Sequence, residues 1–354
     1  MTSFSFPTKS ALISTLISVA LMLACGGNGT IMKPLTTHIY AAGFVTLNAD
    51  TIATYWSDGQ ATVVGARVHP SYATSIAVSD QDIYVAGVEG NGVNDVAKYW
   101  KNGKAFALTD GTQRGFAKSI AVSGNDIYVA GAEQGSRMVA KYWKNGIPIV
   151  LRDLGEGALA QSIFVSGKDV YVAGWMNKTT QTDPIHTLHT QVAVYWKNGV
   201  PVELTRGTAP ALATSVFVDG NDIYVAGLAC ENLAPDCGLA SYWINGAQVQ
   251  LTNLTNTGAT SIFVSGADVY VSGNEGNSTA QVWKNKLPVQ LTLTSSLGSA
   301  ANQLFVSGSD VFVGGAVLND SGNGVATYWK NGVPVSLTDG TEFSSAFAIS
   351  VVVR

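Results

Sequence analysis

One short motif, a tyrosine or valine followed by tryptophan, recurs seven times along the 354-residue chain. The tryptophans are separated by 40 to 53 residues and stand at Trp56, Trp100, Trp143, Trp196, Trp243, Trp283 and Trp329. A period of this length in a chain rich in β-branched and aromatic residues indicates propeller blades. Helical arrays would show a sustained 3.6-residue periodicity, which the repeated region lacks. The repeat therefore predicts an all-β fold built from seven similar units.

Each repeat divides into four short segments with the character of β-strands. In one copy we expect strand A over Ser119–Ser123, strand B over Asp126–Ala130 and strand C over Val139–Lys144, followed by strand D. Asn145-Gly146, between strands C and D, is typical of a type I′ hairpin, because both turn positions need positive φ. Four copies carry proline near the start of strand D. Proline cannot donate to a ladder, so we place D at the outer edge of the blade and A nearest the axis.

The two ends of the repeated region complement each other. The first unit begins at strand B, with His38–Tyr40, and so lacks a strand A. Ala346–Val353 follow the seventh unit and align with the strand A segment Ala259–Val264. We therefore expect the C-terminal strand to complete the first blade, which closes the ring and removes exposed sheet edges. The prediction is a seven-bladed β-propeller of four-stranded antiparallel blades over residues 38–354.

The full unit reads Ala-x-Ser-Ile-x-Val-Ser-Gly-x-Asp-Ile-Tyr-Val-Ala-Gly, then a variable stretch, then Val-Ala-x-Tyr-Trp-x-Asn-Gly. It resembles the repeat of the bacterial seven-bladed β-propeller family, and kelch repeats more distantly. The double glycine of kelch repeats appears only at Gly314-Gly315. The resemblance covers residues 38–354 and implies the same fold. Members of these families are mostly exported or surface proteins of unassigned activity, so no particular function is implied.

The N-terminal segment has the form of an export signal. One positive charge, Lys9, precedes an apolar run, Ala11–Ala24, that suits a signal peptide and is short for a bilayer span. The run ends at a small residue followed by Cys25, which resembles a bacterial lipoprotein signal. The resemblance implies a signal peptide over residues 1–24, and a lipidated cysteine with a flexible tether over residues 25–37. An ordinary cleaved signal is the alternative.

The cysteines and the signal together predict a location in the bacterial cell envelope. A lipid on Cys25 would be the one membrane contact, and secretion is the alternative. Gly26 is not the aspartate that retains some lipoproteins at the inner membrane, so the resemblance favours the outer membrane where one exists. Cys230 and Cys237 share one polar segment, and in an oxidising compartment we expect a disulfide between them. Two free thiols are the alternative.

Charge and motifs narrow the classes of function. Lys and Arg number 20 against 24 Asp and Glu, so the net charge is -4 and broad nucleic-acid binding is not expected. The chain has no Gly-x-Ser-x-Gly, P-loop or His-Glu-x-x-His motif. We therefore expect no cofactor and no metal. We also expect the protein to be a monomer.

Antiparallel strands divide the connecting loops between the two ends of the propeller. The A–B and C–D turns are short and uniform, whereas the B–C and D–A loops vary. We expect the longest loop at Trp175–Gln191. Variable loops on a rigid scaffold commonly carry binding sites. The ligand is therefore expected on the end formed by the B–C and D–A loops, which we call the B–C/D–A face.

Residues outside the repeated pattern are the candidate ligand contacts on this face: Trp175, Asp183, His186, His189, Arg114 and Arg137. The indole of Trp175 suits an aromatic platform for sugar or protein, and packing of the loop onto its blade is the alternative. The two histidines have a spacing seen in some metal sites, but a third ligand is lacking and an ordinary polar loop is favoured. The arginines suit an acidic ligand or are solvated loop charges.

Residues that every blade repeats are expected to serve the structure. An aspartate opens strand B in six units: Asp82, Asp126, Asp169, Asp222, Asp268 and Asp310. A single catalytic site has no use for six copies, whereas an aspartate in a tight turn accepts local backbone N–H bonds. The repeated tryptophans are likewise expected to pack between blades, each indole N–H with a local partner.

Two classes of function follow. The favoured one is a non-enzymatic binding protein that recognises glycan or protein through the B–C/D–A face. The alternative is a carbohydrate-active hydrolase or lyase with a carboxylate site on the same face. Two acids in one central pocket would indicate the enzyme, and a carboxylate-poor, aromatic face would indicate the binder. A purely structural envelope protein is a third possibility.

Overall fold

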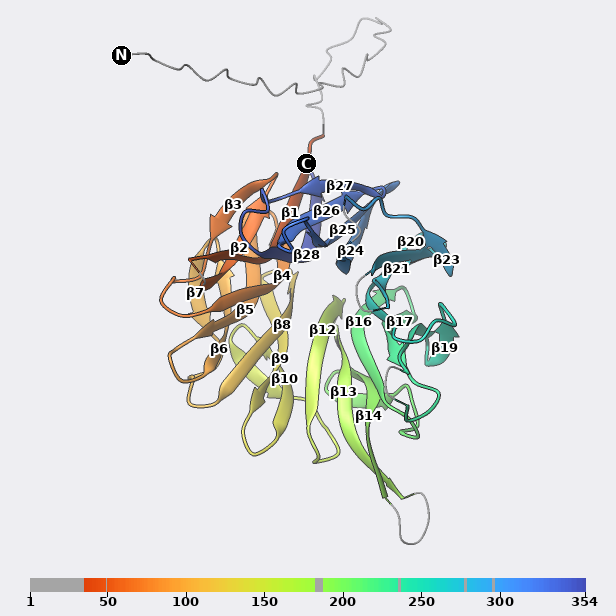
Figure 1. The fold of residues 1–354 in the computed structure, drawn as a ribbon. Coiled ribbons are helices and arrows are strands. Elements are labelled where there is room, and N and C mark those ends of the chain that lie inside the picture. Colours follow the sequence, from red (N-terminus) through yellow and green to blue (C-terminus); the bar gives the residue numbers. More distant parts are fainter. Residues whose placement is uncertain (1–34, 49, 182–186, 235–236, 277–278, 295–296) are drawn as a thin grey trace, which may run out of the picture. The chain divides into compact units, whose positions relative to one another are not determined.

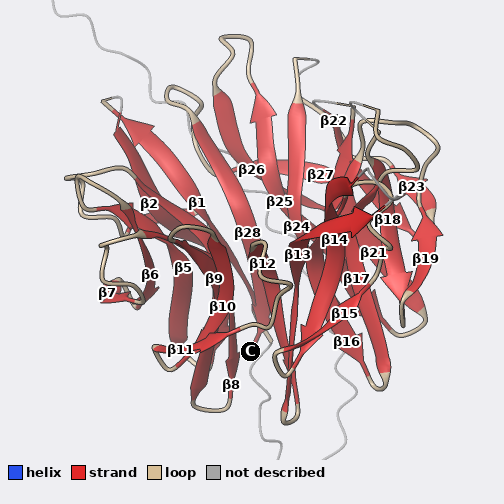
Figure 2. Ribbon diagram, turned by 90° about the horizontal axis from the view of Figure 1, so that it is seen from below, coloured by secondary structure: helices blue, strands red, loops and turns tan. Residues whose placement is uncertain are grey.

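The structure, a computed structural model, describes residues 35–354 except 49, 182–186, 235–236, 277–278 and 295–296. Within this part, Thr36–Arg354 forms one compact unit whose regular elements are all strands (Figure 2). Among the described residues, no helix is long and apolar enough to cross a bilayer.

Seven four-stranded antiparallel sheets follow one another around a ring (Figure 1). The innermost strands of blades 1 to 7 are β28 (Ser344–Val353), β4 (Ser71–Ser79), β8 (Arg114–Ser123), β12 (Ala158–Ser166), β16 (Ala211–Asp219), β20 (Gly258–Ser265) and β24 (Ser299–Ser307). The second strands are β1 (Thr37–Leu47), β5 (Asp82–Gly90), β9 (Asp126–Gln134), β13 (Asp169–Gln181), β17 (Asp222–Ala229), β21 (Asp268–Glu275) and β25 (Asp310–Leu318).

The outer half of each blade completes the sheet. The third strands are β2 (Asp50–Ser57), β6 (Asp95–Lys101), β10 (Met138–Lys144), β14 (Thr187–Lys197), β18 (Leu239–Ile244), β22 (Thr279–Lys284) and β26 (Gly324–Lys330). The outermost strands are β3 (Gln60–Val63), β7 (Lys104–Ala107), β11 (Ile147–Val150), β15 (Val200–Glu203), β19 (Ala247–Gln250), β23 (Leu287–Val289) and β27 (Val333–Ser336). The predicted seven-bladed β-propeller is confirmed, with strand A innermost and strand D outermost.

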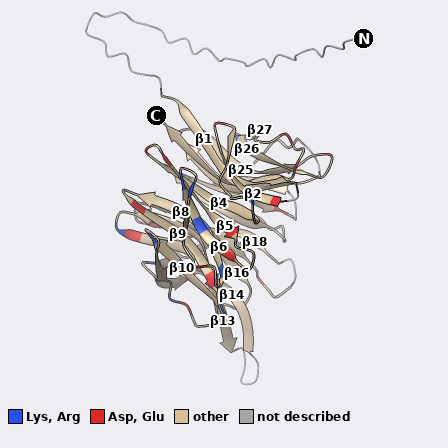
Figure 3. Ribbon diagram, turned by 90° about the vertical axis from the view of Figure 1, so that its left-hand side faces the viewer, with Lys and Arg blue, Asp and Glu red and all other residues tan. Residues whose placement is uncertain are grey.

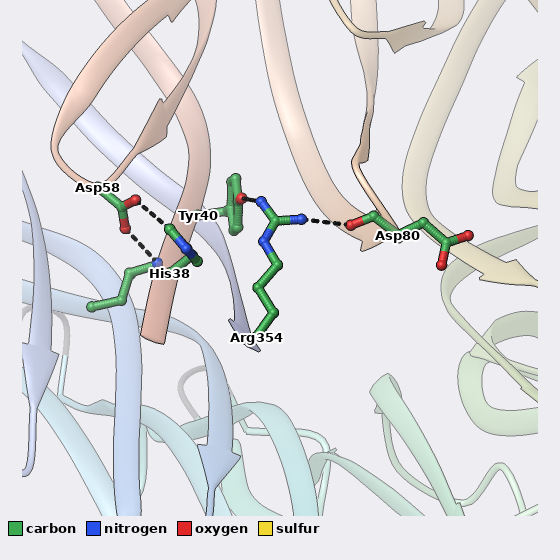
Figure 4. Close-up of polar contacts among 6 residues, drawn as sticks. His38, Tyr40, Asp58, Asp80 and Arg354 are labelled. Carbon is green, nitrogen blue, oxygen red and sulfur yellow. Dashed lines mark hydrogen bonds and ion pairs between the residues drawn. The ribbon is translucent and has the colours of Figure 1, made fainter. Parts of the chain in front are cut away.

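The C-terminal strand closes the ring as the sequence predicts. β28 pairs with β1 over nine residue pairs, among them Ile39 opposite Val351. Beyond the ladder, the Arg354 guanidinium donates to the backbone oxygen of Asp80 (2.7 Å) and to the Tyr40 hydroxyl (3.1 Å), as Figure 4 shows. The last residue therefore ties blade 1 to the first turn of blade 2.

The C–D turns adopt the predicted hairpin geometry. In blade 3, φ is 52° at Asn145 and 82° at Gly146, both in the left-handed region that a type I′ turn needs. The sequence of blade 6 departs at Asn285-Lys286, yet φ is 50° and 71° there. The turn geometry is therefore kept even where lysine replaces glycine.

A cluster of polar side chains locks the two turns of each blade together. In blade 2, the Asn102 amide donates to Asp82 (2.7 Å) and its oxygen accepts the Ile83 N–H (2.9 Å), while Lys101 pairs with Asp82 (2.7 Å). The Lys101 ammonium, helped by Asn102, lowers the pKa of Asp82. The structural role expected of the repeated aspartates fits this arrangement. The hydrogen-bonding atoms differ from those expected. The asparagine oxygen accepts the backbone N–H, and the aspartate accepts a hydrogen bond from the asparagine amide.

Blade 1 builds the same lock from different residues. Asp58 takes the place of asparagine and accepts the Ile39 N–H (2.8 Å), and His38 contacts the other carboxylate oxygen of Asp58 (2.8 Å; Figure 4). The lock therefore persists in the blade that is assembled from both ends of the chain.

The core lies between the blades, where the seven repeated tryptophans are 0 to 2% exposed. Packing is thus confirmed, but the expected partner for every indole N–H is not. Trp196 donates to the Arg152 oxygen (2.6 Å) and Trp329 to the Thr292 oxygen (2.9 Å). Within the described structure, the buried indole nitrogens of Trp56, Trp100 and Trp243 have no partner. Close packing of the large ring therefore outweighs the lost hydrogen bond in these blades.

Each innermost strand carries a β-bulge, which falls at the x of Ala-x-Ser in blades 2 to 6 and at the equivalent place in Ala346-Phe347-Ala348 and Ala301-Asn302-Gln303. In blade 2 the register shifts between Ala73 and Ser75, so Thr74 has no partner on β5. The same shift occurs in the other six blades. A bulge turns its extra residue away from the ladder. Seven side chains are thereby released from regular pairing at one level of the ring.

The longest predicted loop is in fact mostly strand. β13 and β14 pair as far as Gln181 opposite Thr187, so the loop expected over Trp175–Gln191 is wrong for most of its length. The two strands extend beyond the other blades as a β-hairpin (Figure 1). Ladder pairing continues past the repeated register, where Thr179 and Thr180 on β13 and Thr187 and Thr190 on β14 are residues that suit strands.

Candidate functional site

A central cavity of about 240 Å³ lies where the seven innermost strands meet. Its walls are the bulge residues and their neighbours: Thr74, Ser75, Lys118, Ser119, Gln161, Ser162, Thr214, Ser215, Thr260, Ser261, Asn302, Gln303 and Phe347. All but two of these side chains are hydroxyls or amides. Since every blade contributes, the site exists only in the closed ring.

The hydroxyls of this cavity also join neighbouring blades. Thr214 donates to the backbone oxygen of Ala259 in the next blade (2.8 Å), and the Ser215 hydroxyl accepts the Ile262 N–H (3.3 Å). Equivalent threonine bonds start from Thr74 and Thr260, and equivalent serine bonds end on Ser75, Ser119 and Ser162. These contacts hold the lining in place without a ligand.

The same bonds decide what the lining can offer to a ligand. The threonine protons are committed to backbone oxygens, so these hydroxyls present lone pairs. The serine oxygens accept backbone N–H groups, and no described contact has Ser75, Ser119, Ser162 or Ser215 as donor. Their protons are available. The cavity therefore presents donors and acceptors in alternation, as a polyhydroxylated ligand requires.

Lys118 is the one ionisable residue among those that line the cavity. Its ammonium lies 5.8 Å from the centre of the Phe116 ring, and we find no described hydrogen-bond or ion-pair partner for it. Burial, with a smaller contribution from Arg114, lowers the pKa of Lys118. The cavity thus contains a partly desolvated cation without a counter-ion.

A groove continues from the cavity onto the B–C/D–A face over blades 5 to 7. It measures about 520 Å³ and shares Thr214 and Thr260 with the cavity. One wall contains the Cys230–Cys237 disulfide, with sulfurs 2.00 Å apart, which confirms the predicted bridge. The disulfide closes the B–C loop of blade 5 and so fixes this wall of the groove.

Aromatic rings form the opposite side of the mouth. Phe44 lies 5.4 Å from Phe347, which lines the cavity, and 5.4 Å and 5.9 Å from Tyr72 and Phe343 (ring centroids). Tyr72 and Phe343 are 36% and 43% exposed. This cluster leads from the cavity to the surface at blades 1 and 2. Exposed rings of this kind suit the apolar faces of sugars or a protein side chain.

Arg114 is the predicted residue that lies closest in the chain to the cavity lining. It stands at the first position of β8, four residues before Lys118, and both cations lie over Phe116, with the Arg114 guanidinium 5.1 Å from the ring centre. Arg114 also pairs with Asp95 (2.6 Å). It is therefore an anchored rim residue rather than a free solvated charge.

The other predicted residues are dispersed. Arg137 pairs with Asp153, in the connection between blades 3 and 4. Trp175 lies within β13, half-buried, opposite Leu159 and Ala193, so it is part of the sheet and does not open a loop. Of the two interpretations of Trp175 in the sequence analysis, its place in the sheet resembles packing onto its own blade.

Three predicted residues, Cys25, Asp183 and His186, lie outside the described part of the chain. In the described part, no group of three or more His, Cys, Asp or Glu is placed to hold a metal.

His189 is joined to an acid that the sequence did not associate with it. Its Nδ1 lies 2.7 Å from the Thr179 hydroxyl, which donates to Glu156 (2.7 Å). Glu156 and His189 border a separate groove of about 450 Å³ at the base of the β13–β14 hairpin. A hydrogen-bonded series of this kind orients an imidazole. Glu156 is the one acid among the described residues that line this groove.

Two acids near the ends of β5 and β9 are engaged with cations. Glu89 is buried and paired with Lys98, and Glu133 pairs with Lys141 (2.6 Å). On the side drawn in Figure 3, basic and acidic residues lie interspersed. Neither glutamate lines the central cavity.

Sequence reasoning missed the polar cavity and the aromatic cluster. The signal was present in a comparison of the repeats position by position. The residue after the constant alanine varies from Thr74 to Lys118 to Phe347, while a serine follows it in five of the seven blades, and Tyr72 stands where blade 6 has Gly258. A variable position between constant neighbours marks a side chain that the fold itself does not specify.

No protein-family model matches this chain, and no curated protein matches it. Similar folds occur among solved structures. The computationally designed protein Ika8 has 16% identity and a TM-score of 0.45, over 87% of this chain and 90% of that chain. The periplasmic gluconolactonase of Pseudomonas aeruginosa has 13% identity and a TM-score of 0.44, over 88% and 100%.

A third similar structure is the β-propeller domain of the Trilobed protease from Pyrococcus furiosus, with 9% identity and a TM-score of 0.36, over 77% of this chain and 96% of that chain. At such identities the likeness concerns the fold alone. The seven-bladed architecture rests on the strand pairing of this chain, and no match supports membership of the kelch family or of another named family.

Proposed function

We propose that the protein is a non-enzymatic binding protein that admits a hydroxyl-rich ligand, such as the end of a glycan, into the central cavity from the B–C/D–A face. The observation that carries the proposal is the lining of the cavity: hydroxyls and amides from the seven blades, with no acid among the described residues that form it. Fixed donors and acceptors of this kind select a ligand by hydrogen bonding, because an unmatched buried group costs free energy.

The mouth of the cavity supports the same proposal. The groove beside the disulfide accommodates a ligand that continues beyond the cavity, and the exposed rings of Tyr72 and Phe343 provide apolar contact on the other side. The alternative, a carbohydrate-active hydrolase or lyase, needs two acids about 5–9 Å apart around one sugar. Glu89 and Glu133 are instead paired with lysines, so we favour binding.

Filling the cavity is expected to abolish binding while the propeller stays folded. Thr214→Phe places at one bulge position the side chain that blade 1 carries there as Phe347. The variant loses one hydroxyl bond, which costs about 1 kcal/mol. Wild type and variant are compared on a glycan array and by saturation-transfer NMR, and each is checked by thermal unfolding.

Thr62→Phe is the matched control, because Thr62 is exposed on the outermost strand of blade 1. Glycans retained by wild type and by Thr62→Phe but lost by Thr214→Phe support the proposal. A glycan bound equally by all three proteins would place its site elsewhere.

We also propose that the propeller is held at the cell envelope by a lipid on Cys25. The disulfide suits an exported protein, since such bridges persist in oxidising compartments. Cys25→Ser is expected to abolish labelling by a fatty-acid analogue and to shift the protein from the detergent phase to the aqueous phase. Wild-type protein found wholly in the aqueous phase would contradict lipid anchoring and favour secretion.

A further inference from the structure

The position of Lys118 points to a class of ligand. We propose that the central cavity is selective for a monoanionic, polyhydroxylated ligand, a sugar acid whose carboxylate pairs with the Lys118 ammonium. This inference rests on the proposed function, since it names the chemistry of the ligand for the same cavity.

The first argument is charge. Lys118 is the one ionisable group in the described lining, and its ammonium has no described counter-ion. A cation removed from water is costly unless it is paired. Asp95 of the neighbouring blade is engaged with Arg114 at the rim. A ligand carboxylate would supply the missing negative charge.

The second argument is the arrangement of hydrogen-bond donors. Ser75 in blade 2, Ser119 in blade 3 and Ser162 in blade 4 line the cavity on the same side of the ring as Lys118. Their oxygens accept backbone N–H groups, so their protons point to other acceptors. A carboxylate accepts up to four hydrogen bonds and donates none. Three of the four serine donors thus lie in the blade of Lys118 or in the two blades next to it, where they can serve an anion, and the fourth, Ser215, lies in blade 5.

The third argument is the chemistry of the opposite side. Thr214 and Thr260 donate to backbone oxygens and so present acceptors, and Asn302 and Gln303 present amides. These groups suit the hydroxyls of a ligand whose anionic end lies at Lys118. One positive charge matches one negative charge, which favours a carboxylate over a dianionic phosphate.

The volume of the central cavity limits the size of the ligand. A volume of about 240 Å³ corresponds to roughly eight water molecules at ~30 Å³ each. This holds one sugar unit rather than a segment of chain. The ligand is therefore a free sugar acid or the terminal acidic unit of a polymer, in which case the next units would occupy the groove beside the disulfide.

The test measures binding of glucuronate and of glucose by isothermal titration calorimetry with the full chain. Glucose has the same ring and ring hydroxyls, with an uncharged hydroxymethyl group in place of the carboxylate. Wild type is expected to bind glucuronate at least tenfold more tightly than glucose. Lys118→Gln is expected to reduce glucuronate affinity to that for glucose. Lys168→Gln, which removes an exposed lysine from a turn on the opposite face, is expected to change neither.

The melting temperature distinguishes the proposed binding role of Lys118 from a purely structural role. Because the partly buried ammonium has no described hydrogen-bond or ion-pair partner and lies only at 5.8 Å from the Phe116 ring centre, Lys118→Gln is expected to leave the melting temperature unchanged or to raise it. A lowered melting temperature, with glucuronate affinity retained, would overturn the inference. Oligogalacturonides provide a further comparison: tighter binding than the free acid indicates a polymer end, and equal binding indicates a free sugar acid.

The outcomes separate this inference from the function on which it rests. Equal affinity for glucose and glucuronate, both lost in Thr214→Phe, would leave a glycan-binding cavity and refute anion selectivity. A second result would also refute anion selectivity and leave a glycan-binding cavity. In that result, wild type binds neutral array glycans that Thr214→Phe does not bind, and it binds neither glucuronate nor oligogalacturonides. Glucuronate binding that survives Thr214→Phe would remove the site from the cavity and contradict both proposals.

Discussion

Deleting Phe347–Arg354 is expected to unfold the propeller, although these residues are only the end of the chain. β1 would lose its inner neighbour, and its backbone groups opposite the missing strand would lack partners. Ile349 and Val351, 1% and 6% exposed, pack against Phe312 of blade 7, and this contact would also disappear. Each unpaired buried polar group costs about 1–3 kcal/mol, and the whole protein has only ~5–15 kcal/mol of stability.

Circular dichroism and size-exclusion chromatography measure this loss, which we expect to appear as aggregation or a missing thermal transition. Arg354→Ala is the matched control. It removes the two contacts drawn in Figure 4 and leaves the β1–β28 ladder, so about 1–2 kcal/mol is expected. A truncated protein that melts within a degree or two of wild type would exclude closure by the C-terminal strand.

Gly174→Ala is expected to destabilise the protein by about 3 kcal/mol or more, a large effect for one methyl group. A Cβ at this position would lie 2.0 Å from the backbone oxygen of Leu159 and 3.1 Å from the ring of Trp196. The bulge in β12 brings that oxygen over the glycine, and the tryptophan closes the other side. Overpacking usually costs ~1–3 kcal/mol, and here the obstacle is backbone, which cannot rotate away.

Urea unfolding gives the change in midpoint, and Gly258→Ala is the matched control. The Cβ built at Gly258 has its nearest neighbour, a Leu228 methyl carbon, at 3.6 Å, an ordinary contact distance. That variant should unfold within about 0.5 kcal/mol of wild type. Equal midpoints for the two variants would show that the inner strands yield at the bulge.

The blade architecture could be predicted because each repeat carries its own local signals. Asn145-Gly146 fixes a hairpin, the proline of strand D excludes a central position, and the surplus strand at Ala346–Val353 has one vacant place to fill. These signals act over a few residues and recur seven times. A change of sequence in one blade can therefore be compared with the other copies. At Asn285-Lys286 the turn keeps its positive φ angles although lysine replaces glycine.

The functional site could not be predicted in the same way, because no single segment contains it. Each innermost strand contributes one or two side chains to the cavity, and these meet only after closure. In the sequence, the departures from the repeat are most obvious at Trp175 and in the long insertion. That segment continued the ladder instead, since nothing in its sequence terminates a strand near Trp175. Lys118, a change of one residue within a constant motif, was less visible and more informative.

The bulges have a consequence for how such a protein can change over generations. A residue excluded from strand pairing is free of the constraints that keep its neighbours constant, and this chain already places threonine, lysine, glutamine, asparagine and phenylalanine at equivalent points. Seven such points surround one cavity. Single-codon changes can therefore alter charge, size and polarity of the recognition surface one step at a time, while the ring that supports it is inherited unchanged. Duplicated copies of this gene could acquire different ligands without first losing stability.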